Sequence, residues 1–182
     1  MNYSITKKLE IDIIKDICQV LFGALFLGLF AKIYIPLFFS PIPIVLQNSI
    51  ALSYGYFFGA KKGAISVLLF IALGIFGLPF FASGSFGLQT LMSATGGYIL
   101  SYLLATYLVG MCFQKFKEPT SKNISYIIVS GHLLVLFGGF LWFSFFVGVK
   151  QAFLLGVVPF IATDILKSIV ITKMIKLKSD YF

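Results

Sequence analysis

Long apolar runs fill most of the chain, and short stretches rich in proline, glycine, serine or lysine separate them. A helix needs about 20 apolar residues to cross a hydrocarbon core of about 30 Å. The pattern therefore predicts an all-α integral membrane protein with six transmembrane helices, in a single domain over residues 1–182. The expected helices cover about 17–35, 44–59, 63–80, 94–113, 124–147 and 151–172.

The connections between these helices differ in composition. Four of the five are a proline-rich segment over 36–43, a tight turn at Lys61 and Lys62, a glycine- and serine-rich stretch over 82–87 and a polar loop over 114–123. Proline interrupts a helix because it lacks a backbone donor, and glycine does so because of its conformational freedom. An even number of crossings places both termini on the same side of the membrane.

Composition excludes a water-soluble domain. Hydrophobic residues make up 59% and charged residues 11% of the chain, and its mean hydropathy is +1.02. An ordinary soluble domain carries about 25% charged residues. The formal net charge of +8 comes from lysine alone, because the sequence contains no arginine. Proteins that read nucleic acids rely on the forked arginine guanidinium, so we expect membrane lipid, and no nucleic acid, as the partner of this charge.

Lysine positions predict the orientation of the chain. If both termini are cytoplasmic, only Lys32 and Lys150 lie outside, Lys167 lies within a membrane segment, and all other lysines lie inside. Short cytoplasmic loops of membrane proteins carry such an excess of positive charge. The N-terminal lysines and first apolar run imitate a signal peptide, but the run is too long and lacks a cleavage site, so we expect a retained first helix.

One pair of ionisable residues lies at membrane depth. Asp164 and Lys167 stand three residues apart in the last predicted helix, so they share a face and can interact. Charged residues within a membrane are costly and usually face a cavity or one another. A polar recognition site fits the pair, with Asp164 accepting N–H donors and Lys167 donating to an oxygen. The alternative is a structural ion pair, or a Lys167 side chain that extends to the inner interface.

Further polar and small residues gather near the outer ends of the predicted helices. Non-helical backbone at membrane depth is tolerated only where it is buried in protein or lines a cavity. We therefore expect the two outer connections and the last helix to converge on one polar pocket. Twenty-two Phe and nine Tyr predict aromatic walls, which suit a small amphipathic ligand. The candidate residues, besides the ionisable pair, are Gln47 with one or two of its neighbours Asn48 and Ser49, Ser83, Gly84, Ser85, Gln89, Thr90 and the run from Ser93 to Tyr98, which includes Thr95.

The sequence contains no pattern typical of an enzyme. A phosphate-binding loop, a nucleophile elbow, an HExxH motif and paired intramembrane aspartates are all missing. His132 is the only histidine, and Cys18 and Cys112 have no partner at metal-ligand spacing, so we expect no catalytic residue, metal or cofactor. If ATP drives transport by this chain, another protein must hydrolyse it.

Small residues in the first predicted helix allow another helix to approach closely. Ala24 and Gly28 have the small-xxx-small spacing of packed membrane helices. The approaching helix belongs either to the same chain or to a partner, and the spacing leaves both possibilities open.

Several stretches resemble the BioY family, the biotin-binding S components of energy-coupling factor (ECF) transporters. They are IPIVLQ (42–47), YGYFFGAKKGAISVLLFIALGIFGLPFFASG (54–84), SATGGYILSYLLA (93–105) and the D-x-x-K pattern within PFIATDILK (159–167). The resemblance implies an S-component bundle of six helices that binds biotin on the outer side. It also implies docking on a membrane-embedded T subunit, powered by two cytoplasmic ATPase subunits, with Ala24 and Gly28 in the docking face.

Biotin matches the expected pocket in its chemistry. With the resemblance, Asp164 is the expected acceptor for the ureido N–H groups, and Lys167 is the expected donor to a carbonyl or carboxylate oxygen. The sequence departs from the usual family pattern at Val45, where Thr is usual, and at Ala94, where Pro is common. Other expected contacts and apolar walls are Gln47, Ser83, Gly84, Phe81, Phe86, Thr95 and Tyr98.

The leading hypothesis is capture of biotin and its uptake across a bacterial cytoplasmic membrane, with no covalent chemistry in this chain. A second hypothesis keeps the S-component architecture but replaces the ligand by another vitamin or a biotin precursor, because Val45 lacks the usual hydroxyl. A third, of a different class, is a non-transporting membrane scaffold subunit in which Asp164 and Lys167 only brace the bundle.

Overall fold

The protein is mostly helical in a computed structural model that describes residues 2–181, with side chains described for residues 10–178. A two-stranded antiparallel sheet and two short 3-10 turns, Phe30–Lys32 and Ala82–Gly84, interrupt the helices. In chain order the elements are α1 (Asn2–Leu29), β1 (Tyr34–Leu37), β2 (Ser40–Val45), α2 (Gln47–Phe57), α3 (Gly59–Ile75), α4 (Leu88–Leu91), α5 (Gly96–Phe113), α6 (Ser121–Val147), α7 (Val149–Gly156) and α8 (Val158–Tyr181).

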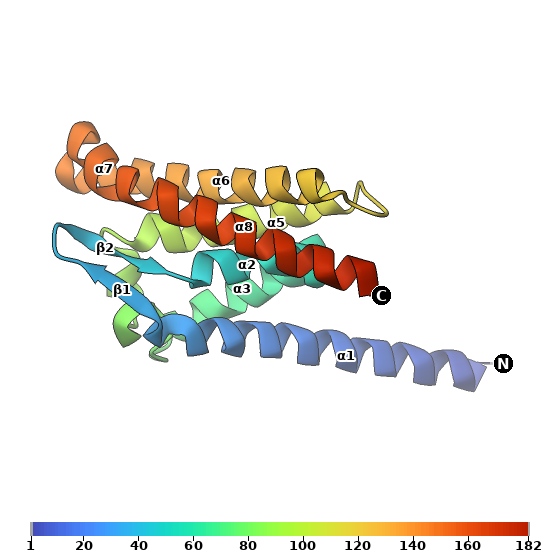
Figure 1. The fold of residues 1–182 in the computed structure, drawn as a ribbon. Helices are drawn as coiled ribbons and strands as arrows, with labels where there is room; N and C mark the ends of the chain where they lie inside the picture. The colour runs from blue at the N-terminus through green and yellow to red at the C-terminus, as the bar shows by residue number, and fades with distance from the viewer. Residues whose placement is uncertain (1, 182) are drawn as a thin grey trace.

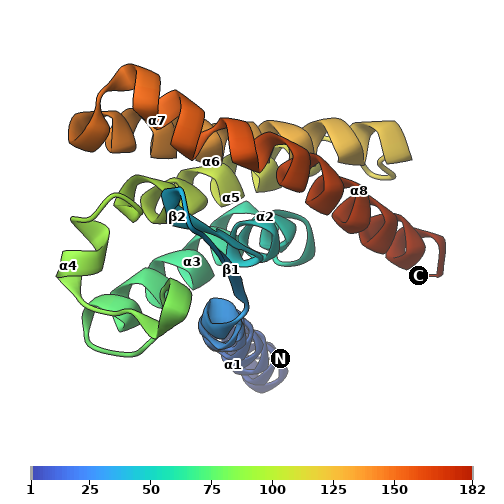
Figure 2. The same cartoon turned by 60° about the vertical axis from the view of Figure 1, so that its left-hand side comes forward.

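The long helices run side by side along one axis (Figure 1). Helix α5 lies in the middle, where it packs against α2, α3 and α6, while α1 packs on α3 and α8 packs on α6. Both chain ends lie at one end of this bundle, and the β1–β2 hairpin and α7 lie at the opposite end (Figure 1). Figure 2 turns the hairpin end forward and shows the loop that carries α4 at that end as well.

The surface of the bundle is suited to lipid. Four helical stretches are long and apolar enough to cross a membrane, and they cover Glu10–Lys32, Gly96–Phe113, Ser121–Val147 and Val149–Lys178. Large apolar side chains point outward along them, as Leu25, Leu104, Phe137 and Leu166 illustrate with more than half of each side chain exposed. Such a surface is costly in water and favourable in hydrocarbon. The chain is therefore a multi-pass membrane protein.

The proline-rich connection forms a β-hairpin, although the sequence predicted only a link between helices. Helix α1 ends at Leu29 and α2 begins at Gln47, so the predicted helix end near residue 35 and start near residue 44 are both wrong. Proline explains the difference, because it removes a helix donor and favours extended backbone in the residue before it. The three prolines of the hairpin are Pro36, Pro41 and Pro43.

The turn between α2 and α3 lies at Phe58 and Gly59, so the predicted turn at Lys61 and Lys62 is wrong. Gly59 has a φ of +79°, a left-handed conformation that glycine adopts without a steric penalty. The two lysines therefore belong to the start of α3. Lys62 forms an ion pair with Asp16 of α1, which links the first and third helices.

The third and sixth predicted helices also end differently. Helix α3 ends at Ile75, although the sequence predicted an end near residue 80. The last predicted helix, about 151–172, is divided into α7 and α8 at Val157, whose φ and ψ are −119° and −57°. Pro159 follows this break, and its missing backbone N–H is tolerated in the first turn of α8. Helix α8 then continues to Tyr181, well beyond the predicted end.

The small residues of α1 pack inside the chain. Ala24 is completely buried, and a side-chain carbon added at Gly28 would lie 2.5 Å from the ring of Phe80. A carbon added at Gly23 on the same helix would lie 2.8 Å from the Phe58 ring and 2.9 Å from Ser66 Oγ. Neighbours from the same chain therefore account for the close packing at Ala24 and Gly28, and a docking face for a partner subunit at these residues stays a prediction.

Close approach of α5 and α6 depends on Gly97. A Cβ atom added there would lie 2.1 Å from the Cβ of Trp142 and 2.9 Å from the backbone oxygen of Gly138. Trp142 cannot move freely, because its Nε1 donates a hydrogen bond of 2.9 Å to the backbone oxygen of Ser93. The two helices can therefore reach this spacing only with glycine at position 97.

Substitution of Gly97 by valine is expected to destabilise the protein by about 1–3 kcal/mol, because the added carbons overpack the α5–α6 contact. Unfolding in detergent, followed by circular dichroism against temperature or denaturant, measures the loss. The control is Ala162→Val on the exposed face of α8, which is expected to stay within about 0.5 kcal/mol. Equal stability of the two variants would show that the contact tolerates a side chain.

Candidate functional site

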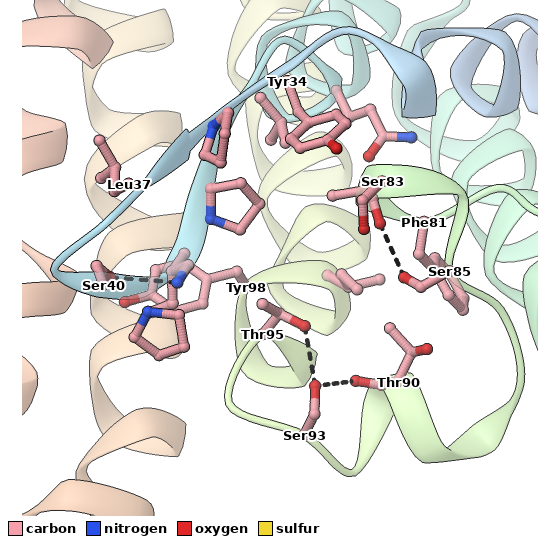
Figure 3. Close-up of a pocket in the computed structure, with 18 of the residues that line it drawn as sticks. Tyr34, Leu37, Ser40, Phe81, Ser83, Ser85, Thr90, Ser93, Thr95 and Tyr98 are labelled. Atoms are coloured by element: carbon pink, nitrogen blue, oxygen red, sulfur yellow. Dashed lines mark hydrogen bonds between the residues drawn. The ribbon is translucent and has the colours of Figure 1, made fainter.

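A cavity of about 440 Å³ lies at the hairpin end of the bundle. Its walls come from the hairpin, the starts of α2 and α5, and the α3–α5 connection over 76–95. Figure 3 shows Tyr34 and Ser40 on the hairpin side and Ser83, Ser85 and Thr95 on the side of the connection. Pockets for small molecules have volumes of about 300–1,000 Å³, so the cavity is large enough for such a ligand.

Hydroxyl groups line the side of the cavity that the α3–α5 connection forms. Ser93 Oγ donates a hydrogen bond of 2.7 Å to the backbone oxygen of Thr90 and lies 3.1 Å from Thr95 Oγ1. Ser83 also lines the cavity and has a positive φ of 59°, which is uncommon for a residue other than glycine. None of the described lining residues of this cavity is charged. This wall can therefore face a polar or anionic group without opposing its charge.

Gln47 lies in the cavity wall but holds the fold together with its amide group. Its Nε2 donates hydrogen bonds of 2.9 Å to the backbone oxygen of Leu27 and 2.8 Å to that of Phe80. These bonds join α2 to the end of α1 and to the connection after α3. Because both amide hydrogens are used, the side chain retains only its carbonyl oxygen for a ligand.

Tyr98 forms an aromatic wall of the cavity. Its hydroxyl group donates a hydrogen bond of 2.7 Å to the backbone oxygen of Gly156, at the end of α7. Its ring lies 6.3 Å from that of Phe160. The ring is therefore held between α5 and the α7–α8 break, and its hydroxyl group is already engaged.

A second space of only about 30 Å³ adjoins the cavity. Asp164 and Lys167 line this smaller space and not the larger one. A volume of this size holds about one water molecule. Five residues line both spaces: Ile42, Pro43, Val45, Tyr98 and Tyr102.

Asn48, Asp164 and Lys167 form a buried polar cluster beside this smaller space, named here the Asp164 cluster. Lys167 Nζ donates to Asp164 Oδ1 at 2.8 Å and to Asn48 Oδ1 at 3.2 Å. Asn48 Nδ2 donates to the same Asp164 Oδ1 at 3.1 Å. The three residues are only 6%, 4% and 9% exposed, in the order Asn48, Asp164, Lys167. The cluster joins the first turn of α2 to the middle of α8.

The other carboxylate oxygen of Asp164, Oδ2, is buried and has no hydrogen-bond partner within the described part of the chain. A buried acceptor without a donor costs about 1–3 kcal/mol, and more when the group is charged. The Asp164 cluster is therefore one donor short of full hydrogen bonding. A ligand that brings an N–H or O–H group to Oδ2 would complete it.

His132 of α6 extends the polar network away from the cavity. Its Nε2 lies 2.8 Å from Ser49 Oγ, and its Nδ1 lies 3.0 Å from Ser168 Oγ and 3.1 Å from the backbone oxygen of Ile128. The side chain is therefore a hydrogen-bonded connection between α2, α6 and α8. Among the described residues there is no group of three or more His, Cys, Asp and Glu that could hold a metal ion.

The structure brings most of the predicted site residues together, but not all. Gln47, Ser83, Thr95 and Tyr98 line the larger cavity. Gly84 and Phe86 are absent from the described walls of both spaces, and the Phe86 side chain is half exposed. Sequence reasoning missed Asn48 as part of the ionisable pair's cluster. The signal was the polar triplet at 47–49, which interrupts an otherwise apolar segment.

The fold and the cavity together define a class: a multi-pass helical membrane protein that holds a site for a small molecule at one end of its bundle. The sequence matches the BioY family over residues 3–179, and the chain belongs to this family.

Named relatives agree with this family. A probable biotin transporter BioY of Pyrococcus horikoshii is 36% identical over 129 residues, which cover 71% of this chain and 75% of the relative. Biotin transporter BioY2 of Lactococcus lactis subsp. cremoris is 32% identical over 152 residues, which cover 82% of both chains. A crystal structure of the S-component for biotin from an ECF-type ABC transporter has a TM-score of 0.82 at 28% identity and covers 92% of both chains.

Removal of one charge from the Asp164 cluster is expected to destabilise the protein more than removal of both. Lys167→Met leaves a buried carboxylate with Asn48 as its donor, and breaking a buried pair in this way costs about 3–5 kcal/mol. The double variant Asp164→Asn, Lys167→Met removes both charges and is expected to lose less. Unfolding in detergent of both single variants and the double variant gives the coupling energy. Additive losses would contradict a buried, interacting pair.

Proposed function

We propose that the protein is the biotin-binding S component of an ECF-type uptake transporter. The observation that carries the proposal is the buried Asp164 Oδ2, which has no partner among the described residues and adjoins a small-molecule cavity in a chain of the BioY family. The names of the relatives and of the similar solved structure support biotin as the ligand.

The ureido ring of biotin complements the Asp164 cluster. A ureido N–H donates to Asp164 Oδ2, the acceptor that lacks a partner. Lys167 has three ammonium hydrogens, and two of them are engaged with Asp164 and Asn48, so one remains for the ureido carbonyl oxygen. The ring thus supplies a donor and an acceptor to a site that needs both.

The carboxylate end of biotin faces the opposite way. A carboxylate beside Asp164 Oδ2 would bring two negative charges together and offer no donor at neutral pH. The wall around Ser83, Ser93 and Thr95 carries no charged side chain, so it does not repel a carboxylate. We therefore place the ureido ring toward Lys167 and the valerate chain in the larger cavity.

Binding at Asp164 requires movement of the shared walls, because the space beside this carboxylate has room for about one water molecule. Three of the five shared residues belong to β2: Ile42, Pro43 and Val45. The hairpin is tied to α7 by Ser40 Oγ, which donates 2.9 Å to the backbone oxygen of Leu155. We propose that the hairpin shifts to admit the ring and then closes the cavity above it.

Uptake of biotin requires that the cavity open on the outer side of the membrane. We propose six crossings, made by α1, α2, α3, α5, α6 and the α7–α8 unit, with both termini in the cytoplasm and the cavity on the outer side of a bacterial cytoplasmic membrane. The excess of lysine at the end that holds the termini supports this orientation. A T subunit and two ATPase subunits supply the energy for transport, and this chain performs no catalysis.

Asp164→Asn is expected to weaken biotin binding at least roughly tenfold. Lys167 and Asn48 both donate to Oδ1, so the amide oxygen takes that position and the amide NH₂ replaces Oδ2, where it opposes the ureido donor. Equilibrium binding of labelled biotin to the purified protein measures the loss. Asp12→Asn, the same change on the exposed part of α1, is the control. Retention of wild-type affinity by Asp164→Asn, or failure of the wild type to retain biotin, would refute the proposal.

Cysteine labelling tests the proposed orientation. In a chain with Cys18→Ser and Cys112→Ser, a cysteine is placed either at Phe38, the fully exposed hairpin tip, or at Lys117 in the α5–α6 connection. A membrane-impermeant maleimide added to intact cells is expected to label position 38 at once and position 117 only after permeabilisation. The reverse order would place the cavity on the cytoplasmic side.

A further inference from the structure

Asn48 is the uncharged member of the Asp164 cluster, and its amide has only one possible orientation. Its Oδ1 accepts from Lys167 Nζ at 3.2 Å and from the backbone N–H of Ser49 at 2.9 Å. Its Nδ2 donates to Asp164 Oδ1 at 3.1 Å. A flipped amide would set its NH₂ group against two donors and its oxygen against a carboxylate, so the surroundings determine the orientation.

This orientation decides which oxygen of Asp164 is free. Lys167 and Asn48 both direct their hydrogens at Oδ1, so Oδ1 has two donors while the buried Oδ2 has none among the described residues. Lys167 alone could approach either oxygen of the carboxylate, because an ammonium group is a compact charge without a preferred direction. The second donor, from Asn48, removes this freedom.

We propose that Asn48 is a positioning residue that makes the site select ligands with an N–H donor. The inference rests on the proposed function, because it assumes that the ligand head group meets Asp164 Oδ2. By holding Oδ1 occupied, Asn48 presents Oδ2 as an acceptor that only a donor can satisfy. A head group with N–H donors, such as a cyclic urea, completes the cluster, whereas one with only acceptor atoms leaves a buried carboxylate oxygen unpaired.

A positioning role for Asn48 can be distinguished from a role in which it only braces the bundle. Asn48 lies in the first turn of α2, between Gln47, which holds α1 and the connection after α3, and Ser49, which contacts His132. If Asn48 only braced α2 against α8, its loss would weaken every ligand of the cavity alike. A positioning role instead changes the preference between ligands that carry N–H donors and ligands that lack them.

The experiment compares three ligands on the purified full-length protein. Biotin and desthiobiotin both carry the ureido N–H groups, while a cyclic carbonate analogue of biotin replaces both N–H groups by oxygen. The wild type is expected to prefer the first two by roughly tenfold or more. In Asn48→Leu this preference is expected to fall to about threefold or less, because Lys167 is then free to move between the two oxygens of Asp164 and satisfy Oδ2 itself.

Two further variants complete the test. Asn48→Ala removes both the donor to Asp164 and the acceptor for Lys167 without adding a charge, and the same loss of preference is expected from it. Asn123→Leu is the same change of an amide to leucine in the first turn of α6, at the end of the bundle away from the cavity. It is expected to keep the wild-type preference. Because the preference is a ratio of affinities within one preparation, an inactive fraction of a variant does not alter it.

Each result decides between the two proposals. A wild type that binds neither biotin nor desthiobiotin refutes the proposed function. A wild type that binds biotin but shows no preference over the carbonate analogue overturns the inference alone. The inference is also overturned if Asn48→Leu and Asn48→Ala weaken all three ligands by the same factor, since that result identifies Asn48 as a purely structural residue.

Discussion

The buried Asp164–Lys167 ion pair is the interaction on which the site depends. Two charges in a membrane-embedded bundle lose their hydration, and their mutual attraction offsets that loss only when neighbouring groups supply further hydrogen bonds. Asn48 supplies some of these bonds, but within the described structure Asp164 Oδ2 receives none. The pair is therefore stable enough to be held in place and incomplete enough to favour a ligand that donates to it. The hydrogen bonds from Asn48 and Lys167 stabilise the pair, and the donor that Oδ2 lacks favours recognition of a ligand.

The start of α2 distributes three consecutive polar residues to three parts of the molecule. Successive residues of a helix project about 100° apart, so neighbours cannot share one face. Gln47 reaches the end of α1 and the connection after α3, Asn48 reaches α8, and Ser49 reaches His132 of α6. A short polar triplet thus connects most of the bundle to the site. A shift of α2 would therefore move the cavity wall and the Asp164 cluster together.

The sequence predicted those features that depend on the mean hydropathy of long segments or on charge. Helices α5 and α6 end at Phe113 and Val147, as the apolar runs indicated, and the Asp164–Lys167 pair is buried as its membrane depth implied. Features that depend on individual contacts were not predictable in this way. The hairpin depends on cross-strand pairs such as Tyr34 with Val45. The role of Asn48 depends on the distance between α2 and α8. Neither the periodicity nor the composition of the sequence contains this information. Ala24 and Gly28 illustrate the same limit, because the small-xxx-small pattern indicates that another helix packs closely but does not identify the chain to which that helix belongs.

The hairpin is the part of the cavity wall that is best suited to move. A two-stranded hairpin has little stability of its own, so its position depends on what it contacts. Among the described residues, one side-chain hydrogen bond joins the hairpin to the rest of the bundle, from Ser40 Oγ to the backbone oxygen of Leu155. The opposite wall is bonded to helices through the side chains of Gln47 and Trp142. Strand β2 also supplies three of the five residues that line both the cavity and the space at Asp164. A ligand that donates to Asp164 Oδ2, which has no partner among the described residues, would therefore displace the wall that has the fewest side-chain hydrogen bonds to the helices.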